Sequence, residues 1–347
     1  MNANVRYALA AAGVALLVAV PWVPLPLPPF FSEPLRAPGT LNLLALCFVF
    51  GSLALSYDLI FGFAGLLSFG HALYFAAGVY TAAIALTRWH WTLPQALIFT
   101  LALSIVLPAL VGAVCLRVRD IQFAMVTLAF AQAGSILIMQ NPFGLTGGEE
   151  GLALGVNALP GFLVGVANTR NLYWIALGVL ALTCAIGWWS VNSAPGRVWQ
   201  AIRENERRVA VIGLNPYFYK LGAFVVSSFL ASMAGTVYLL IEGSASPDVT
   251  TANFTLALLV MVVLGGVGTL WGAVLGGIVY EYLDFRLVVL ANASQLQSLP
   301  SYLRIPLSEP LFILGVLFIV LVLFVPGGLA GAVRRLNAAI HVSSGSH

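Results

Sequence analysis

The stretch GFAGLLSFGHALYFAAGVY, from Gly62 to Tyr80, is almost wholly apolar, yet it contains four glycines and one histidine. In water, glycine weakens a helix by about 1 kcal/mol relative to alanine, so this stretch would be a poor helix. In a lipid bilayer, small residues let helices approach each other closely. The interpretation depends on the solvent, and in lipid the stretch predicts a closely packed, interrupted helix.

The composition of the chain indicates that this solvent is a membrane. Of the 347 residues, 61% are hydrophobic and 8% are charged, whereas about 25% of the residues of a soluble domain are charged. Long apolar runs recur, and a run of about 18 residues or more is typical of a transmembrane helix. The sequence predicts an all-α, polytopic membrane protein with about ten transmembrane helices, some of them short or discontinuous.

The apolar runs predict where these helices lie. They cover residues 7–24, 40–60, 66–87, 94–115, 121–140, 171–191, 217–241, 254–269, 271–290 and 309–326. The number of helices stays open between about eight and eleven, because 254–290 fits either two short helices or one long kinked helix. We divide the chain into an N-terminal transmembrane helix with a proline-rich connection (1–39), a transmembrane core (40–330) and a cytoplasmic tail (331–347).

Basic residues predict the orientation, because cytoplasmic loops carry an excess of lysine and arginine. With the N-terminus in the cytoplasm and ten spans, ten of the fifteen basic residues lie on the cytoplasmic side. These ten are Arg6, Arg117, Arg119, Arg197, Arg203, Arg207, Arg208, Lys220, Arg334 and Arg335. We therefore expect both termini to be cytoplasmic.

The longest hydrophilic connection on that side is SAPGRVWQAIRENERRVAVIGLNPYFYK, from Ser193 to Lys220. Four aliphatic residues recur in it at the spacing of a helix face, namely Val198, Ile202, Val209 and Ile212. Glu204 and Arg208 have the spacing of an i to i+4 ion pair. The segment predicts a short amphipathic helix that lies in the lipid interface or fits a groove on a soluble partner. The acidic residues among the arginines favour the partner.

Four stretches of the sequence resemble the LivM-type permeases of branched-chain amino acid ABC importers. They are GLLSFGHALYFAAGVYTAA (65–83), FAMVTLAFAQ (123–132) with TGGEEGL (146–152), GRVWQAIRENERRVAVIGLNPYFYKLGAFVVSSFLASMAGTVY (196–238) and VVLGGVGTLWGAVLGG (262–277). The resemblance covers about residues 40–330. It implies an ABC-importer permease fold and a multi-pass protein of the bacterial inner membrane.

The resemblance also implies partners. In that family two permeases pair in the membrane, two cytoplasmic ATPase subunits bind beneath them, and a periplasmic protein delivers the ligand. We therefore expect a LivH-like second permease, two ATPase subunits and a periplasmic substrate-binding protein. The chain has no G-x-x-x-x-G-K-[ST] phosphate loop, so we expect no cofactor in this chain, with ATP and Mg on the partner ATPase.

By the same resemblance, a coupling helix at about 197–214 fits the ATPase. The residues expected to couple to the ATPase are Arg197, Ile202, Arg203, Glu204, Arg207, Arg208, Ile212, Gly213 and Leu214. On the opposite side, the resemblance suggests that the loop NPFGLTGGEEGL (141–152) receives the binding protein or lines the outer gate. A solvated turn is the simpler alternative. The residues of interest in this loop are Thr146, Gly147, Gly148 and Glu149.

Two segments are unusually rich in glycine, 62–80 and 265–277, one in each half of the chain. Interrupted helices in corresponding halves are typical of a transporter pathway, although glycines also serve helix packing. Both interpretations stay open for Gly62, Gly65, Ser68, Gly70, His71, Gly265, Gly266 and Gly268. Because an ionisable group inside a span usually faces a cavity or a partner, we interpret His71 as bonded to a neighbouring helix, with substrate contact as the alternative.

Three acidic residues lie in the predicted spans. Asp58 is near the cytoplasmic end of its span, where its side chain can extend to the interface. Glu281 and Asp284 are about one turn apart late in a span, which predicts an interfacial cluster at the outer end, with a cation site as the alternative.

We expect neither an enzyme site, a metal site nor a nucleic-acid interface. The four histidines are scattered, and neither an H-E-x-x-H motif nor a nucleophile elbow is present. The leading hypothesis is the permease of an ATP-driven importer of branched-chain amino acids. The alternatives are the permease of a urea or short-amide importer, and a stand-alone ion-coupled carrier that uses His71, Asp58 or Glu281.

Overall fold

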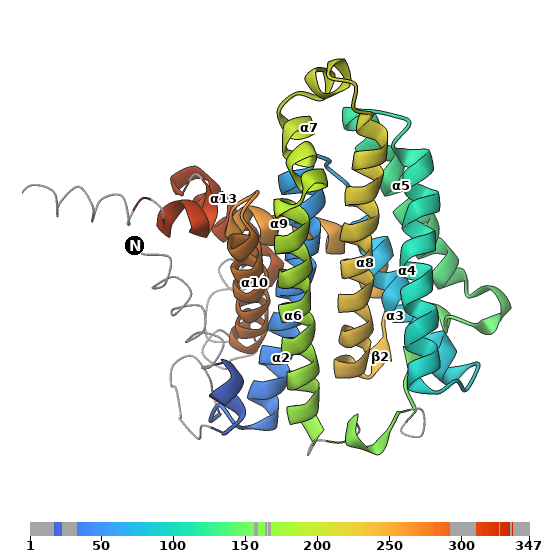
Figure 1. Ribbon diagram of the computed structural model, residues 1–347. Coiled ribbons are helices and arrows are strands. Elements are labelled where there is room, and N and C mark those ends of the chain that lie inside the picture. Colours follow the sequence, from blue (N-terminus) through green and yellow to red (C-terminus); the bar gives the residue numbers. More distant parts are fainter. Residues whose placement is uncertain are drawn as a thin grey trace, which may run out of the picture.

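The computed structural model describes residues 17–22, 33–155, 159–163, 165, 168–291, 310–325, 327–333 and 335. Most of the predicted N-terminal helix, most of the proline-rich connection and most of the tail 331–347 lie outside the described residues. The described chain is a bundle of helices with one two-stranded ribbon (Figure 1). The predicted all-α class is confirmed.

The α-helices are α2 (Pro38–Asp58), α3 (His71–Thr87), α4 (Leu93–Cys115), α5 (Asp120–Gln140), α6 (Thr169–Asn192), α7 (Ala194–Val211), α8 (Pro216–Glu242), α9 (Ala252–Gly265), α10 (Leu270–Ala291) and α13 (Pro310–Phe324). A π-helical turn, η2 (Leu59–Phe63), extends α2. Short 3-10 turns occur at Val20–Trp22, Pro142–Gly144, Gly148–Glu150, Gly161–Leu163 and Pro247–Thr250. Strands β1 (Leu152–Ala153) and β2 (Ser244–Ala245) pair antiparallel.

Five helices of the described chain are long and apolar enough to cross a membrane. They are α2 with η2, α4, α5, α6 and α8. Each coincides with a predicted apolar run, and α10 and α13 coincide with two further runs. α10 is also long, but it carries three charged residues, Glu281, Asp284 and Arg286.

Two predicted spans are shorter than expected. α3 begins at His71 rather than at residue 66 and has 17 residues, and α9 ends at Gly265 and has 14. A helix that crosses a bilayer alone needs about 20 residues. Gly65, Gly266 and Gly268 all have positive φ, a conformation that glycine adopts without strain, so the chain leaves the helical path at both places. The region 254–290 is therefore two helices rather than one long kinked helix.

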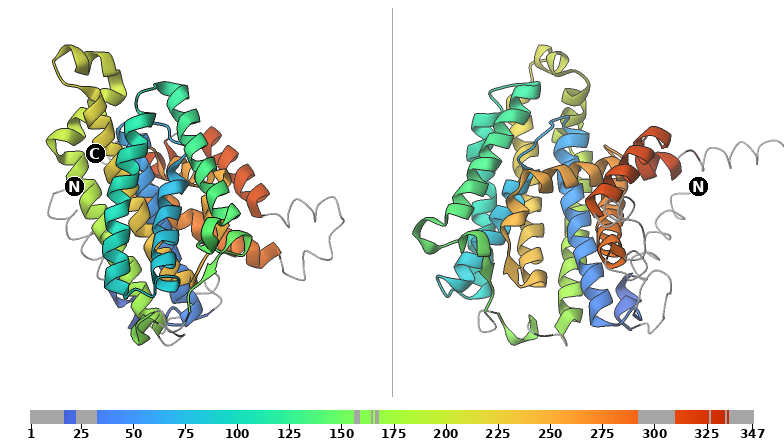
Figure 2. Two further views of the ribbon diagram at one scale, coloured as in Figure 1. Left: turned by 90° about the vertical axis from the view of Figure 1, so that its right-hand side faces the viewer. Right: turned by 180° about the vertical axis from the view of Figure 1, so that it is seen from behind.

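The central helix is α2. In the most apolar 18-residue stretch of α2 with η2, 89% of the residues are buried. α2 packs against α6, α8 and α10, which surround it in Figures 1 and 2. The hydroxyls of Ser52 and Ser56 donate to the carbonyls of Phe48 (2.8 Å) and Leu53 (2.6 Å) in the same helix. These bonds satisfy both hydroxyl donors inside an apolar core.

Close packing of α3 against α8 depends on one glycine in each helix. A Cβ at Gly78 would overlap the Ser232 carbonyl of α8, and a Cβ at Gly235 would overlap the Phe75 carbonyl of α3. The Ser232 hydroxyl donates to the Tyr74 carbonyl at 2.7 Å. Small residues and a hydroxyl bond between helices are the usual means of helix association in membranes.

Replacing Gly78 by leucine is therefore expected to separate α3 from α8 and to destabilise the protein by roughly 1–3 kcal/mol, as overpacking does. The measurement is the thermal unfolding midpoint of purified protein in detergent. The matched control is Gly178→Leu on α6, where an added Cβ meets nothing within 4 Å. Equal midpoints for the two variants would contradict the close contact.

The connections divide into two ends of the bundle (Figure 1). One end, here called the α7 end, carries α7 and the α4–α5 connection with Arg117 and Arg119. The opposite end carries the α3–α4 connection, the segment after α5 and the β1–β2 ribbon, which joins the α5–α6 and α8–α9 connections. The α7 end also carries the described basic residues of 117–220 that were predicted to be cytoplasmic, namely Arg117, Arg119, Arg197, Arg203, Arg207, Arg208 and Lys220.

Candidate functional site

Helix α7 is fixed to the bundle by its apolar face. The Ser193 hydroxyl accepts from the Gly196 amide at 3.2 Å and caps the helix N-terminus. Trp199, Ile202 and Val209 are buried, and the Trp199 indole donates to the Tyr219 carbonyl of α8 at 2.8 Å. The predicted amphipathic helix therefore forms, and its apolar side packs on the chain itself.

A break at Asn205 divides α7 into two parts. Asn205 has non-helical dihedrals (φ −162°, ψ 98°), and its side-chain oxygen accepts from the Arg208 amide at 3.1 Å, as an N-cap does. The predicted i to i+4 pair of Glu204 with Arg208 is wrong, because the break lies between the two residues. Instead, Glu206 pairs with Lys220 of α8 at 2.6 Å.

Arg203 extends from α7 to the two glycine-rich segments. Its Nη1 donates to the carbonyl of Gly62 in η2, the turn that extends α2. A Cβ at Gly65 would lie 2.9 Å from Arg203 Cγ, and a Cβ at Gly268 would lie 2.8 Å from Arg203 Nη1. Such distances are too short for real side chains, so the arginine occupies space that these glycines leave open.

Asp58 completes this arrangement from within the bundle. Its side chain is fully buried, and its Oδ1 accepts from the Gly268 amide at 2.8 Å, just before α10 begins. A carboxylate there is favoured by the positive end of the helix dipole. A Cβ at Gly62 would overlap Asp58 Oδ1. The expectation that Asp58 extends to the interface is wrong, since the carboxylate instead holds the start of α10.

We call Asp58, Gly62, Gly65 and Gly268, together with the Arg203 side chain, the Arg203 site. It joins an exposed helix to two interrupted segments that are far apart in the sequence. No ion pair within 4 Å links Arg203 to Asp58 in the part of the chain that the structure describes. The bonds from Arg203 to Gly62 and from Gly268 to Asp58 go through backbone atoms, so they fix the path of the chain.

His71 lies in a neighbouring buried polar network. Its Nε2 is 3.0 Å from the Ser56 hydroxyl of α2, and its ring packs edge-on against Tyr57 and Tyr74. The network also satisfies backbone groups of the interruption between η2 and α3. Its bonds are Tyr57 to the Ser68 carbonyl (3.0 Å), the Gly70 amide to Ser68 (3.3 Å), the Phe69 amide to Thr127 (3.2 Å) and the Ala72 amide to Thr255 (3.2 Å).

These bonds explain how irregular backbone survives inside an apolar bundle. In a membrane every polar backbone group needs a partner within the protein, and hydroxyls of α5 and α9 supply two of them. His71, Ser68 and Gly70 thus lie together, next to the Arg203 site. Gly265 and Gly266 lie elsewhere: Gly265 packs against the Gly272 carbonyl of α10, and Gly266 packs against Ala330.

The remaining predicted coupling residues lie on the outside of α7. Arg197, Glu204, Arg207, Arg208, Ile212 and Gly213 are exposed, Leu214 is partly exposed and Ile202 is buried. A cavity of about 600 Å³ lies between α7, the segment 64–69 and the start of α5. Six charged residues of both signs line it, namely Arg119, Asp120, Arg203, Glu204, Glu206 and Lys220.

Sequence reasoning missed three of the residues that shape this end. Asn205, Asp120 and Lys220 were not among the expected site residues. Asn205 carries a usable signal, because asparagine within a helical pattern favours caps and breaks. Lys220 pairs with a residue 14 positions away, and only the return of α8 beside α7 brings the two together.

At the opposite end, the loop after α5 is a built structure rather than a simple solvated turn. The Asn141 side-chain oxygen accepts from the amides of Thr146 (2.8 Å) and Gly147 (3.2 Å), and the Thr146 hydroxyl donates to the Ile138 carbonyl (2.7 Å). Asn141 and Phe143 both have positive φ. Phe143 is 95% exposed, a feature that sequence reasoning missed, and Glu149 is exposed beside it in the loop.

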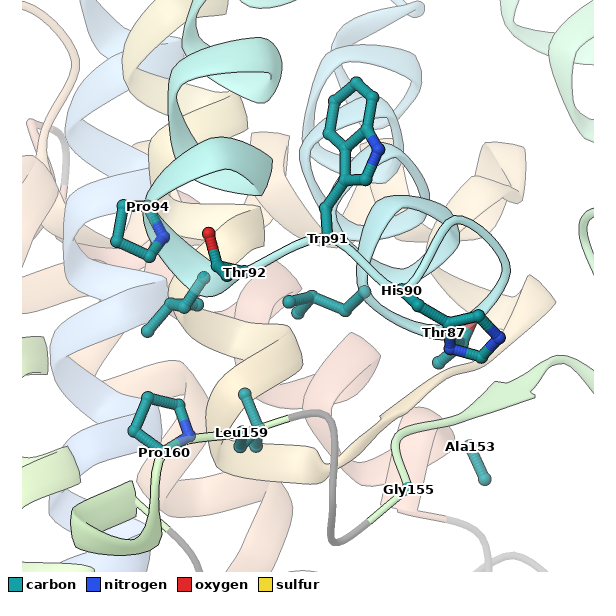
Figure 3. A pocket seen from close by; sticks show the side chains of 11 residues that line it. Thr87, His90, Trp91, Thr92, Pro94, Ala153, Gly155, Leu159 and Pro160 are labelled. Atoms are coloured by element: carbon teal, nitrogen blue, oxygen red, sulfur yellow. The ribbon is translucent and has the colours of Figure 1, made fainter.

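A second cavity, of about 580 Å³, lies at this opposite end. Figure 3 shows Thr92 and Pro94 at the start of α4, with Leu159 and Pro160 of the α5–α6 connection across from them. Its only titratable lining residue among those described is His90. It lies away from α7 and contains none of the residues predicted from the sequence.

The acidic residues of α10 form no recognisable ion site. Glu281 and Asp284 are partly buried on α10. Among the described residues, no group of three or more His, Cys, Asp or Glu side chains is arranged to hold a metal ion. The three cysteines are free, with Cys47 and Cys115 buried and Cys184 partly buried.

Comparisons with known proteins find related sequences over most of this chain. A family model described as the permease component of branched-chain amino acid transport systems matches residues 39–325. The chain is 30% identical over 297 residues to the high-affinity branched-chain amino acid transport system permease protein LivM of Escherichia coli and 28% identical over 294 residues to that of Salmonella typhimurium. Each comparison covers 76% of this chain.

More distant relatives include the permease protein LivH of Salmonella typhimurium, at 25% identity over 65% of this chain and 78% of LivH. The ribose import permease protein RbsC of Haemophilus influenzae is 24% identical over 84% of this chain and 89% of RbsC. The chain spans 65% and 64% of the length of the two LivM relatives above. No solved structure matches it.

Proposed function

The chain belongs to the family of permease components of branched-chain amino acid transport systems, and on that premise we propose that it imports branched-chain amino acids together with an ATPase. The chain is a multi-pass membrane protein. The observation that best supports coupling to an ATPase is the Arg203 site, in which a surface helix bonds to Gly62 and lies close to Gly65 and Gly268 of the interrupted segments. This bond adds a direct link from α7 to the interruption after α2, beyond the links of α7 to α6 and α8.

In this proposal the ATPase binds the exposed side of α7, which carries Arg197, Glu204, Arg207, Arg208 and Ile212. The buried side holds α7 to α8 through Trp199 and the Glu206–Lys220 pair. Movement of α7 then reaches the Gly62 carbonyl directly through Arg203. The same movement reaches the start of α10 through Gly268, whose amide is bonded to Asp58.

The relatives of the chain suggest its partners. Because relatives named LivM and LivH both match the chain, we propose a LivH-like second permease, with the translocation pathway between the two. Two ATPase subunits carry ATP and Mg, and this chain binds neither. The α7 end faces the cytoplasm of a bacterial inner membrane, as the basic residues at that end support. A periplasmic binding protein docks on the opposite end, where Phe143 and Glu149 are exposed.

Reconstitution tests the proposal. The chain, its paired permease, the ATPase subunits and the binding protein are placed in proteoliposomes, and uptake of radiolabelled leucine is followed with and without ATP. We expect uptake only with the full set and ATP. Leucine uptake by the chain alone, driven by an ion gradient, would establish a carrier instead. Uptake of labelled urea in place of leucine by the full set would assign the urea or short-amide alternative.

A further inference from the structure

Gln132 is in an unusual place for a membrane helix. It lies on α5, twelve residues and therefore about 18 Å from the start of the helix, near the middle of the span. Its side chain is exposed, and no hydrogen bond joins it to any other described residue. An amide that faces hydrocarbon without a partner is costly, so this position is not expected to face lipid.

The other spanning helices provide the contrast. The exposed interior positions of α4 are apolar and include Ile98, Ile105, Val106, Leu110 and Val114. Those of α6 include Leu182, Trp188 and Trp189. Among the five candidate spans as the structure describes them, Gln132 is the one polar side chain that is exposed more than a turn from a helix end. The outward faces of α4 and α6 are apolar between their ends, whereas the outward face of α5 is interrupted by Gln132 at its middle.

The face around Gln132 combines one carboxamide with apolar residues. Met125, Ala129, Gln132, Ile136 and Met139 share it at helical spacing, and all five are exposed. Gln122 and Gln140, also exposed, lie near the two ends of the helix. The buried face of α5 points the other way, where Thr127 and Ser135 bond to the Phe69 amide and to Thr250. The exposed face therefore points away from the described bundle.

We propose that this face of α5 lines the polar passage through which the amino acid crosses the membrane, with Gln132 as the contact at its middle. The proposal rests on the proposed function of the chain as one of two paired permeases. A carboxamide both donates and accepts hydrogen bonds, so Gln132 can bond the carboxylate or the ammonium group of a zwitterion. Because it carries no charge, it does so without the strong binding that would hold the solute in place.

The first turn of α5 indicates where this passage ends. Asp120 and Ile121, in the first turn, line the cavity of about 600 Å³ at the α7 end. That cavity contains charged groups of both signs, a suitable exit for a zwitterion. α5 lies at the edge of the bundle beside α4 (Figures 1 and 2), where a second permease can complete the passage.

Thiol accessibility tests the proposal in the complete transporter. With Cys47, Cys115 and Cys184 replaced by alanine, Gln132→Cys is exposed to a membrane-impermeant methanethiosulfonate in membrane vesicles. Ile105→Cys on the lipid-suited face of α4 is the matched control, at a similar distance from the α7 end. We expect Gln132→Cys to react at least tenfold faster than Ile105→Cys. We also expect the modification rate of Gln132→Cys to change when leucine, binding protein and ATP are added.

Three outcomes separate the possibilities. If Gln132→Cys reacts no faster than Ile105→Cys in a complex that still transports leucine, the proposal is overturned and the proposed function is left intact. An unreactive Gln132→Cys that forms a disulfide with a cysteine of the second permease overturns it as well, because the face is then a dry contact. Fast reaction of Gln132→Cys, when the same complex with Gln132 intact transports no leucine, refutes the proposed substrate and supports the water-filled passage.

A second measurement uses transport itself. Gln132→Leu is expected to lower the maximal uptake rate about tenfold, the effect of losing one hydrogen bond to the solute, at an unchanged amount of assembled complex. Gln132→Asn, which keeps the carboxamide, is expected to retain a larger part of the rate. Equal uptake by the leucine variant and the unmodified protein would contradict a contact with the solute.

Discussion

Replacing Arg203 by alanine is expected to lower ATP-dependent leucine uptake by about 10- to 150-fold while the ATPase subunits stay bound. The substitution removes a hydrogen bond from a charged donor to the Gly62 carbonyl, and such bonds contribute about 1.5–3 kcal/mol, which corresponds to that range. α7 keeps its buried face and its bond to Tyr219. The complex is therefore expected to hydrolyse ATP without moving the spans.

The measurement pairs leucine uptake with ATP hydrolysis and with the amount of ATPase that copurifies. Arg207→Ala is the matched control, because Arg207 is exposed on the same helix and makes no bond to the bundle among the described residues. We expect it to weaken ATPase binding, more strongly at low salt, where surface charges are less screened. If Arg203→Ala loses the ATPase to the same extent as Arg207→Ala, then Arg203 binds the ATPase rather than the spans.

Replacing Gly62 by alanine is expected to be far more damaging than one methyl group usually is. The new Cβ would overlap both Asp58 Oδ1 and the Gly268 amide, and so would displace the bond that holds the start of α10. Overpacking strain costs roughly 1–3 kcal/mol, and a buried acceptor left without its partner costs a similar amount. We expect uptake to fall by at least a hundredfold, with a lower unfolding midpoint.

The control for this variant is Gly222→Ala on α8, where an added Cβ meets nothing within 4 Å. Alanine favours a helix over glycine by about 1 kcal/mol, so this control is expected to be neutral or slightly stabilising. Asp58→Asn, which keeps a side-chain oxygen for the Gly268 amide, is expected to be milder than Gly62→Ala. A Gly62→Ala protein with normal uptake and stability would show that the close approach seen here is unimportant.

Composition and apolar runs predicted most of the fold. The all-α class and the positions of α2, α4, α5, α6 and α8 follow from run length alone, because a bilayer demands about 20 apolar residues per crossing. The interruptions before α3 and after α9 were harder to place. They depend on positive φ at Gly65, Gly266 and Gly268, and glycine in a sequence is equally compatible with a helix, a break or a close contact.

The site was predicted in pieces rather than as a whole. Arg203, Gly62, Gly65 and Gly268 were all expected to matter, but for different reasons: the arginine for ATPase binding and the glycines for a pathway or helix packing. Their meeting depends on tertiary contacts between residues up to about 200 positions apart, which no local pattern encodes. Asp58 was placed at the interface for the same reason, since its bond to Gly268 spans 210 positions.

A reversible covalent link tests most directly the central claim, that Arg203 transmits movement from α7 to the interrupted segment. An ideal Cβ at Gly65 lies 3.1 Å from Arg203 Cβ, slightly closer than the separation of about 3.5–4.5 Å in a disulfide. Gly65 has positive φ, so Gly65→Cys alone is the control for local strain. Gly65→Cys with Arg203→Cys is therefore made in a background without Cys47, Cys115 and Cys184, and leucine uptake is measured after reduction and after oxidation. The account predicts weak uptake when the thiols are reduced, as for Arg203→Ala, and recovered uptake when the disulfide replaces the lost contact. Uptake that is lower after oxidation than after reduction would show that α7 and the segment must separate during transport, which contradicts the account.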